Sequence, residues 1–431
     1  MQKLPLKSRL REYIRLPLLM REWKKVVDGI GVKPSLPSSS MKRFLIIPCD
    51  QKTVIGSRGD EAMMIAMIQS IRAKNSDAVI SLLTYADFEH PVLLEYDIGV
   101  IPKWANPTWS LKKILEVCSD FDSVMIVGAD TMDGHYSLLN SARLWVVADS
   151  VARLGKNSTI LGFSFNSKPD PKIINVIKKI SSRVNILLRD PVSHARFEKA
   201  TGRQARCAAD AAFQLHESEA IPQMNDLLHW IDTKRTGNSK IVGFNVHPML
   251  FDMSDPAVKE KFVQDCSRAL LHAMGELPIS VLLISHDFRG SNEADLGLLE
   301  SIYTNLKNDA GNGVYLDRHP YSATELKFIA GNMDAVFSAR MHLCIATLGM
   351  KKPVGVLTYQ GKFEGLFSYF KLPGELMLDP KSTNLEDDIF LALSFLVNNL
   401  TQLTGAVNES WAGVKQLSAL NTLAATGASL E

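Results

Sequence analysis

The sequence has no apolar stretch that approaches the roughly 20 residues a helix needs to span a membrane. It has little net charge, formally +2, which argues against a nucleic-acid-binding protein that must neutralise many phosphates. Cysteines are few and form no C-x-x-C pair, which predicts reduced thiols and a cytoplasmic protein. The five are Cys49, Cys118, Cys207, Cys266 and Cys344. We therefore expect no nucleic-acid partner and a cytoplasmic location.

Several common catalytic motifs are also missing. The loop at residues 56–63, "GSRGDEAM", has neither the G-K-[ST] ending of a P-loop nor the G-x-G-x-x-G spacing of a dinucleotide site. The stretch "FSFNS" is not the G-x-S-x-G turn of a serine hydrolase. His286 and Asp287 are adjacent but have no third metal ligand nearby in the sequence. We expect no metal site and no cofactor.

The first 30 residues are basic, with eight Lys or Arg side chains against three acidic ones. Apolar residues recur there at helical spacing on both sides of Pro17, which predicts one or two amphipathic helices. The following stretch at 32–40, "VKPSLPSSS", has the composition of a linker. Such a segment either docks on a membrane surface or partner, or packs on its own protein, and the sequence leaves both open.

After residue 41, short apolar runs alternate with segments of helical periodicity. Runs such as "RFLIIPC" and "ISVLLISHD" are apolar almost throughout, as expected for parallel strands that helices cover on both faces. A polar stretch at 232–240 interrupts the alternation, which then begins again. The pattern predicts an α/β protein of two doubly wound, Rossmann-like domains, GT-B-like, with the active site in the interdomain cleft. The expected divisions are a basic segment with its linker, two domains and a loosely held tail, at residues 1–40, 41–235, 236–400 and 401–431.

Polar residues follow most of the apolar runs. In an open α/β sheet, ligands bind outside the carboxyl ends of the strands, so these residues are expected to converge. One polar residue in such a place is usually a helix cap, but capping does not easily explain a whole series. The residues are Asp130, Arg189, Asp190, Asn245, His247, His286, Asp287, Arg340, His342 and Tyr359.

Arg189 is a first candidate for binding an anion. Asp190 and Pro191 fit a helix cap and a first helical turn, which leaves Arg189 outside the expected helix. Arg189 then either points into the cleft or forms an internal ion pair, for example with Asp210.

Arg340 and His342 are stronger candidates, because they stand where an apolar strand gives way to a helix. A guanidinium beside the amides of a helix start suits a phosphate or a carboxylate. The other interpretation of His342 is a histidine satisfied within the core. A similar strand-to-helix loop at 56–63 has glycines that permit close backbone approach, and Asp60 is expected to cap its helix.

These stretches resemble the polysaccharide pyruvyl transferase family over about residues 43–370. The matching pieces, in the family's order, are "GDEAM", "LLRDPVS", "AADAAFQL", "ISHDFRG", "LKFIAGNMDAVFSARMHLCIATLGMKKPV" and "TYQGKFEGL". The most specific part is the succession R-x-H, G-x-x-P and Y-x-x-K, with one extra residue in the second element. Two places depart from the family: Ser57-Arg58-Gly59, where many members have an asparagine before Gly-Asp, and "GADTMDG", where a glycine triplet is common. Both fall in the half that is expected to bind the acceptor.

The resemblance implies transfer of pyruvate from phosphoenolpyruvate to two hydroxyls of a sugar, as a cyclic ketal, with release of phosphate. Protonation of the enol methylene makes an electrophilic carbon, one hydroxyl attacks it, phosphate leaves and the second hydroxyl closes the ring. Such a donor needs cations, a general acid and a general base, but neither a metal nor a redox cofactor.

The resemblance also implies roles for particular residues. His342 is the first choice for proton transfer, because the intrinsic pKa of histidine lies near working pH, and the second candidate is the pair His286 and Asp287. The residues expected to bind the donor are Arg340, Met341, Arg189 and Lys362. Those expected to bind the acceptor are Gly59, Asp60, Glu61, Asp130 and Asp133.

The expected acceptor is a glycan of a bacterial-type exopolysaccharide or cell surface, or its lipid-linked precursor. A lipid-linked acceptor would give the basic segment at 1–30 a use, as a peripheral contact with the inner face of the membrane. The alternatives are a GT-B glycosyltransferase with a nucleotide-sugar donor and a noncatalytic glycan-binding relative.

Overall fold

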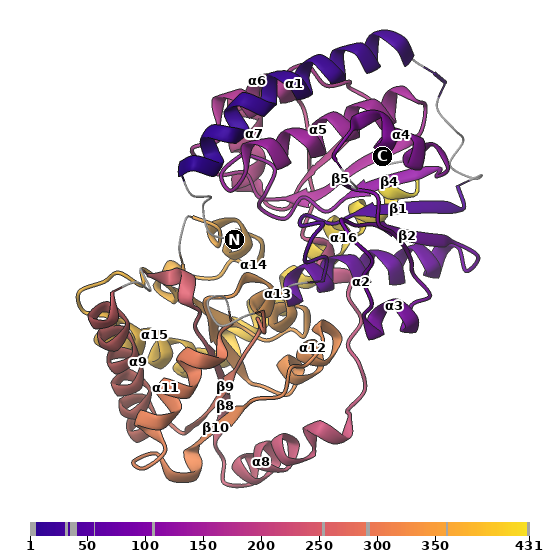
Figure 1. Ribbon diagram of the computed structural model, residues 1–431. Helices are drawn as coiled ribbons and strands as arrows, with labels where there is room; N and C mark the ends of the chain where they lie inside the picture. Colours follow the sequence, from indigo (N-terminus) through magenta and orange to yellow (C-terminus); the bar gives the residue numbers. More distant parts are fainter. Residues whose placement is uncertain are drawn as a thin grey trace. The chain divides into compact units, whose positions relative to one another are not determined.

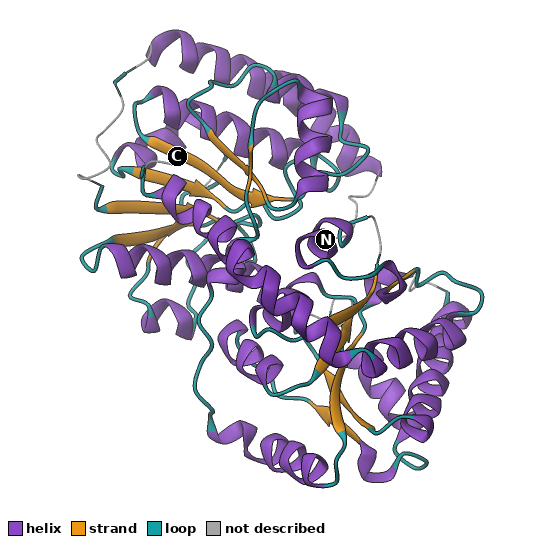
Figure 2. Ribbon diagram, turned by 180° about the vertical axis from the view of Figure 1, so that it is seen from behind, coloured by secondary structure: helices purple, strands orange, loops and turns teal. Residues whose placement is uncertain are grey.

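The computed structural model describes residues 6–30, 33–34, 41–55, 57–105, 108–251, 255–289, 294–358 and 361–428 (Figure 1). The chain forms two compact units. Unit 1 comprises Met1–Ile55, Met63–Leu215 and Lys415–Glu431, and unit 2 comprises Gly56–Ala62 and His216–Val414. Each unit has one parallel sheet with helices on both faces (Figure 2), as the sequence predicts. Tyr359 and most of the expected linker at 32–40 lie outside the described residues.

Unit 1 contains a seven-stranded sheet in the order β3-β2-β1-β4-β5-β6-β7, with parallel pairing throughout. The strands are β1 (Arg43–Ile47), β2 (Val79–Leu83), β3 (Gly99–Ile101), β4 (Ser123–Ile126), β5 (Asn157–Phe163), β6 (Asn185–Leu188) and β7 (Arg206–Cys207). The central strands are buried along almost their whole length, which explains why they are apolar without alternation. The edge strands β3 and β7 are too short to give a sequence signal.

The helices of unit 1 cover this sheet. They are α1 (Leu6–Ile30), α2 (Arg58–Lys74) from Met63 onward, α3 (Pro91–Glu95), α4 (Leu111–Ser119), α5 (Leu138–Arg153), α6 (Pro171–Ile177) and α7 (Pro191–Thr201). Helix α5 is the most buried, and its Trp145 packs against the rings of Phe163 and Phe197. Asp190 caps α7 and Pro191 is its first residue, as predicted.

The basic N-terminal segment forms a single helix, α1, with Pro17 inside it. Its Leu16, Leu19 and Trp23 are buried, and the helix contacts α5 and α4. Glu12 accepts a backbone N–H bond from the first residue of α5, and Glu22 accepts one from the first residue of α4. Of the two interpretations of the segment, packing on its own protein therefore holds for this face of the helix.

Unit 2 contains a six-stranded sheet in the order β10-β9-β8-β11-β12-β13, again with parallel pairing throughout. The strands are β8 (Lys240–Asn245), β9 (Ile279–Ile284), β10 (Val314–Asp317), β11 (Ala335–Ser338), β12 (Val354–Leu357) and β13 (Met377–Leu378). In both sheets the order reverses beside the first strand, at β1/β4 in unit 1 and at β8/β11 in unit 2. Loops diverge at such a switch point, so a ligand fits there.

The helices of unit 2 are α8 (Asn225–Thr236), α9 (Pro256–Glu276), α11 (Leu296–Leu306), α12 (Ala323–Gly331), α13 (Met341–Gly349), α14 (Glu364–Phe370), α15 (Leu385–Asn398) and the first part of α16 (Leu400–Ala425). Among the described residues, no single helix is long and apolar enough to cross a membrane. Helices α15 and α16 pass that test only as a pair, and they are bent by 73° at the break between them.

The units divide the chain differently from the expected boundaries. The stretch Gly56–Ala62 belongs to unit 2, although its place in the sequence assigns it to the first domain. Unit 2 resumes at His216, and the first part of the polar stretch at 232–240 is the end of helix α8. A surface helix and a linker have similar compositions, so the sequence does not separate them.

The C-terminal end is not the loosely held tail that its small polar residues predict. Its residues continue α16 as far as Ala425, and Asn421 is fully buried in unit 1. The side chain of Asn421 accepts a hydrogen bond from Gly162 N at 2.8 Å and donates one to Ala209 O at 2.9 Å. These hydrogen bonds satisfy the side-chain amide, and this allows an asparagine that the sequence suggests is exposed to lie in the interior.

Candidate active site

Arg340 stands at the switch point of unit 2, as the N-cap residue between β11 and α13. Its guanidinium donates to Oδ1 of Asp295 from Nη2 at 2.6 Å and from Nε at 2.9 Å. Its Nη1 lies 3.2 Å from Oδ2 of Asp287. These two carboxylates hold the guanidinium, and the side chain as a whole keeps 13% of its surface exposed.

Asp295 is the centre of this network and is fully buried. It accepts hydrogen bonds from Asn245 Nδ2 at 2.9 Å and from the backbone N–H groups of His286 at 2.9 Å and Asp287 at 3.2 Å. Burial raises the pKa of Asp295, while Arg340 and these hydrogen bonds act in the opposite direction. One carboxylate thus ties together the ends of β8, β9 and β11. Sequence reasoning missed Asp295, because it follows a polar loop and not an apolar strand.

Asp287 has guanidinium partners on two sides. Arg289 donates to it from Nη2 at 2.7 Å and from Nε at 3.0 Å, and Arg340 approaches it as described. The expected pairing of Asp287 with the His286 ring is not among these bonds. The local reason is that Arg289, two residues further on, reaches back to the carboxylate and occupies both of its oxygens.

His286 and His342 both belong to this edge of the sheet. Burial lowers the pKa of His286 well below its usual value, and the charges of His342, Arg340 and Arg58 lower it further. His286 is therefore neutral near pH 7. His342 is the second residue of α13 and remains partly exposed, so it is not the fully enclosed core histidine of the alternative interpretation.

Gly59, in the first turn of α2, lies directly against His342. A Cβ atom placed on Gly59 would stand 2.3 Å from Nδ1 of His342 and 2.7 Å from its Cγ. The predicted close approach at this glycine is therefore real, but the approaching group is the imidazole. Asp60 is not the cap of α2, because its own N–H donates to Oγ of Ser57 at 3.2 Å. Ser57, directly before the helix, is therefore the residue that caps α2. Asp60 is the third residue of the helix and receives this cap.

Arg58 and Glu61 hold this first turn in unit 2. Arg58 donates to Glu61 Oε2 at 2.6 Å and to Pro320 O at 2.9 Å, and its guanidinium lies 5.4 Å from the ring centroid of Phe288. Glu61 is fully buried, and its other oxygen accepts the N–H of Ala323 at 2.9 Å. The departure from the family at Arg58 thus falls among the residues of unit 2 and beside His286, not in the half assigned to the acceptor.

His247 is a second buried histidine, which follows β8. Its Nδ1 accepts from Met249 N at 3.1 Å and its Nε2 lies 3.2 Å from Ala339 O, so the ring is neutral with its proton on Nε2. Burial lowers the pKa of His247 well below its usual value, and the charges of Arg340 and Lys362 add to this. Lys362 is 8% exposed, and its charge acts at the same edge as Arg340. Met341 is the first residue of α13.

Arg189 lies in unit 1 and forms the internal ion pair with Asp210 that the sequence left open as the alternative to a ligand. It is buried, donates from Nε to Ser164 Oγ at 2.7 Å, and lies with Nη1 3.1 Å from Oδ2 of Asp210. The guanidinium that was expected to bind the donor is therefore paired with a carboxylate of its own unit. Asp210 is 21 residues away in the chain, too far for the sequence alone to decide between the two.

The two acidic residues after β4 differ from each other. Asp133 is fully buried, and accepts the N–H of His135 at 2.9 Å, the N–H of Asn166 at 3.0 Å and the side-chain amide of Asn166 at 2.6 Å. Burial raises the pKa of Asp133. Asp130 is partly exposed and accepts the hydroxyl of Tyr136 at 3.0 Å. Of these two carboxylates, only Asp130 faces solvent.

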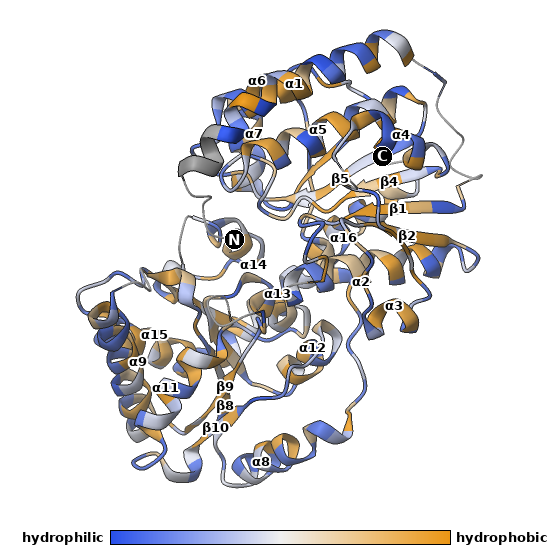
Figure 3. Ribbon diagram, in the orientation of Figure 1, coloured by the Kyte–Doolittle hydropathy of each residue, from blue (hydrophilic) through white to orange (hydrophobic). Residues whose placement is uncertain are grey.

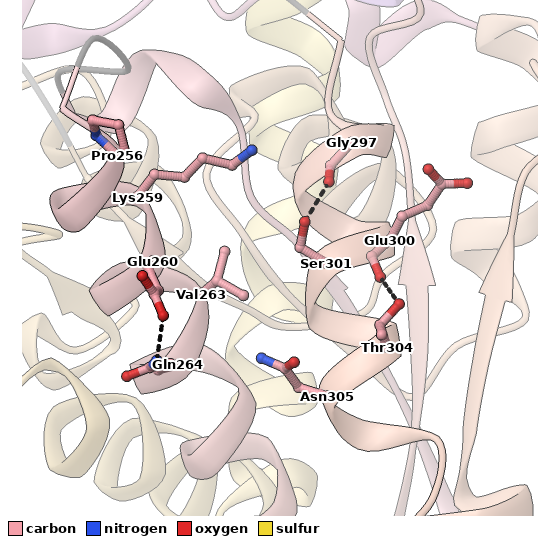
Figure 4. Close-up of a pocket in the computed structure, with 10 residues that line it drawn as sticks. All are labelled: Pro256, Lys259, Glu260, Val263, Gln264, Gly297, Glu300, Ser301, Thr304 and Asn305. Carbon is pink, nitrogen blue, oxygen red and sulfur yellow. Dashed lines mark hydrogen bonds between the residues drawn. The ribbon is translucent and has the colours of Figure 1, made fainter.

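A groove of about 600 Å³ lies elsewhere in unit 2, between helices α9 and α11 (Figure 4). The hydrogen bonds between its lining residues run within single helices, for example from Gln264 to Glu260 and from Ser301 to Gly297. None of the predicted site residues lines it. Within the described ranges, no group of three or more His, Cys, Asp or Glu side chains is placed to hold a metal ion.

The described edge of unit 2 therefore brings together cations and histidines from five segments of the chain. Its cations are Arg58, Arg289, Arg340 and Lys362, and its histidines are His247, His286 and His342. Such a set can bind an anion and move a proton, because it combines fixed positive charge with a neutral buried histidine and a second histidine that is partly exposed.

A family model described as polysaccharide pyruvyl transferase matches residues 58–361 of the chain. No curated protein matches it. Among solved structures, a glycosyltransferase from Rickettsia africae is similar with a TM-score of 0.56 and 13% identity, covering 89% of this chain and 97% of that one. UDP-GlcNAc 2-epimerase from Neisseria meningitidis, bound to UDP-GlcNAc, is similar with a TM-score of 0.53 and 11% identity, covering 89% and 99%. At these identities the likeness concerns the fold, which is GT-B-like as predicted.

Proposed function

The chain belongs to the polysaccharide pyruvyl transferase family, and we propose from this that it transfers pyruvate from phosphoenolpyruvate to a sugar of an exopolysaccharide, a cell-surface glycan or its lipid-linked precursor. The product is a cyclic ketal, and phosphate is released. The observation that carries the proposal is the pair Arg340 and His342 at the start of α13, beside a neutral His286. This pair matches the R-x-H motif and lies at the switch point of its sheet.

In the proposed reaction, His342 donates a proton to the methylene carbon of phosphoenolpyruvate, and C2 becomes an oxocarbenium-like electrophile. A sugar hydroxyl forms the first C2–O bond and gives up its proton. Neutral His286 suits that proton, because its lowered pKa keeps a lone pair available near pH 7. The C2–O bond to phosphate breaks, and the second hydroxyl closes the ring and passes its proton to His342, which the first step left without one.

Cations of unit 2 bind the two anionic groups of the donor in this proposal. Arg340 and Arg289 are both partly exposed, and Asp287 orients both of them. Arg58 and Lys362 add positive charge nearby. Such preorganised charge stabilises a transition state without reorganisation at the moment of reaction. Arg189 drops out of the donor set because Asp210 uses its charge.

For the acceptor, we propose a contact from Asp60 of unit 2, whose side chain is partly exposed; Asp130 of unit 1 is also partly exposed and stays a predicted acceptor residue. Glu61 and Asp133 are fully buried, with both carboxylate oxygens bonded to the protein, so they shape their loops instead. Gly59 acts through its contact with His342.

Two measurements test the proposal. Thermal unfolding is followed with phosphoenolpyruvate and, in parallel, with a panel of nucleotide sugars, because a true ligand raises the melting temperature by mass action. Phosphate release is then measured with a set of sugar acceptors, with and without chelator. We expect stabilisation by phosphoenolpyruvate and phosphate release that survives chelation. Stabilisation by a nucleotide sugar alone, or activity that chelator removes and magnesium restores, would replace this proposal with the glycosyltransferase alternative.

A further inference from the structure

Helix α1 has a second face, opposite the one that packs on unit 1. On that face Ile14 keeps 70% and Leu18 keeps 60% of their surface exposed, although both are large and apolar. Figure 3 shows hydrophobic and hydrophilic residues interspersed along this helix at the outside of its unit. Residues four apart are neighbours on a helix, so the two aliphatic side chains form one small patch.

Basic side chains surround this patch. Arg11, Arg15, Arg21 and Lys25 are all exposed and follow the same side of the helix, at spacings of four or six residues. The helix also has acidic residues, but Glu12 and Glu22 are turned inward, where they bind the starts of α5 and α4. Among the described side chains of α1, Asp28 is the exposed acid, and it lies near the helix end. The outer face is therefore cationic and apolar at once.

The neighbouring elements extend the positive surface. The Nζ atom of Lys172, at the start of α6, lies 3.8 Å from the ring centroid of Tyr13. Lys112 and Lys113 are exposed on α4, whose first residue is bonded to Glu22 of α1. Exposed lysines thus lie on two helices that neighbour α1, although Asp170, which accepts the hydroxyl of Tyr13, lies beside one of them.

We propose that the outer face of α1 binds an anionic lipid surface, with Ile14 and Leu18 entering the headgroup boundary and the basic side chains contacting lipid phosphates. An exposed aliphatic pair framed by Arg and Lys is the pattern of helices that lie in a membrane interface. The long basic side chains can cover apolar surface with their stems while their charges reach the headgroups. This inference does not depend on which donor or sugar the protein uses.

The structure decides how the inference is tested. Deleting the N-terminal segment is unsuitable, because α1 also buries Trp23, whose indole N–H bonds to Asp149, and supplies bonds to α4 and α5. Point substitutions on the outer face avoid this problem. The charge variant replaces four exposed cations: Arg11→Gln, Arg15→Gln, Arg21→Gln and Lys25→Gln. Its matched control removes the same charge from four exposed lysines elsewhere: Lys74→Gln, Lys240→Gln, Lys307→Gln and Lys381→Gln.

The full-length proteins are sedimented with vesicles of phosphatidylglycerol and phosphatidylcholine. Because each basic residue near an anionic surface is worth about a fivefold change in binding at low salt, the charge variant should lose at least about 100-fold, and the control little. Binding by the unchanged protein should weaken as salt is raised. Equal loss in the control would show that net charge alone is responsible, and would overturn the proposal.

A second variant, Ile14→Ser with Leu18→Ser, tests the apolar part and also serves if the charge variant does not fold. It should weaken vesicle binding at least about tenfold while the melting temperature stays unchanged, because both side chains are exposed in the folded protein. Unchanged vesicle binding in this variant would overturn the interfacial mode of contact. Equal binding of the unchanged protein to purely phosphatidylcholine vesicles would overturn the requirement for an anionic surface.

Discussion

Units 1 and 2 share a doubly wound topology, but they use charge differently at the carboxyl ends of their strands. In unit 1, Arg189 forms a buried ion pair with Asp210, and the buried Asp133 accepts hydrogen bonds from backbone amides. In unit 2, Arg340 and Arg289 share the carboxylate of Asp287 and keep exposed faces. The comparison teaches that the topology places the loops at this edge, while the number of cations there and their partial exposure decide what the edge can bind.

The comparison also explains how one buried carboxylate can serve function. Asp295 does not face a ligand, yet it fixes Arg340 and the backbone of His286 and Asp287 at once. Unit 1 uses Asp133 in a similar way to join the loops after β4 and β5. A buried carboxylate thus orders both edges, but Asp295 binds a guanidinium whereas Asp133 binds backbone and side-chain amides.

The largest expected effect is that of Arg340→Ala, compared with Arg189→Ala. Each substitution leaves a buried carboxylate without its guanidinium, so both should cost about 3–5 kcal/mol of stability, measured by urea unfolding. Only Arg340→Ala should also lower phosphate release, by about 10²–10³ per folded molecule. An equal loss of turnover in Arg189→Ala would break the comparison between the two units.

The next effect is that of His342→Gln. As the proposed proton donor, His342 should contribute about 10²–10³ to the rate, while its partial exposure makes the loss of stability small. His229→Gln, at an exposed position of α8, is the control and should keep full activity. If His342→Gln folds and keeps normal turnover, His286 becomes the better candidate for the residue that donates the proton.

The two buried histidines make unit 2 sensitive to acid. Burial lowers the pKa of His247 and His286 in the folded protein, whereas in the unfolded chain each gains a proton below about pH 6.5. The unfolded state then binds more protons, so stability falls as the pH drops below about 6.5, by up to about 1.4 kcal/mol per pH unit for each histidine.

Urea midpoints at pH 7.5, 6.5 and 5.5 measure this slope, and His247→Gln should reduce it. Hydrogen exchange should show the loss of protection in unit 2, because the histidines of unit 1, His90, His135 and His194, are not fully buried. Equal loss of protection in both units would contradict this assignment.

The smallest expected effect is that of Gly59→Ala. The added methyl group would stand within 2.3 Å of the His342 ring, so the imidazole must move and turnover should fall by about tenfold or more. Gly275→Ala in α9 is the control, since nothing lies within 4 Å of the new carbon. Retained activity in Gly59→Ala would mean that the position of the ring is not critical.

Much of the fold could be predicted because its signals are local. Fully apolar runs predict parallel strands, Asp190 with Pro191 predicts the start of α7, and the R-x-H motif places Arg340 and His342 at a strand end. Each of these depends on neighbours within a few residues. The short edge strands escaped detection, since two or three residues do not make a pattern.

Only the tertiary structure shows the contacts between residues that lie far apart in the sequence. From the sequence, Arg189 could bind a ligand or pair with Asp210. The fold brings the loop after β7 close to the end of β6, and the structure shows the ion pair. It gives no sign that Gly59 would meet His342, or that Asn421 would be buried against the backbone of unit 1. It determined the amphipathic pattern of α1, but not which of its residues would be covered. Periodicity is encoded residue by residue, whereas the partner of a buried charge depends on which chain segments the fold brings within about 3 Å of it.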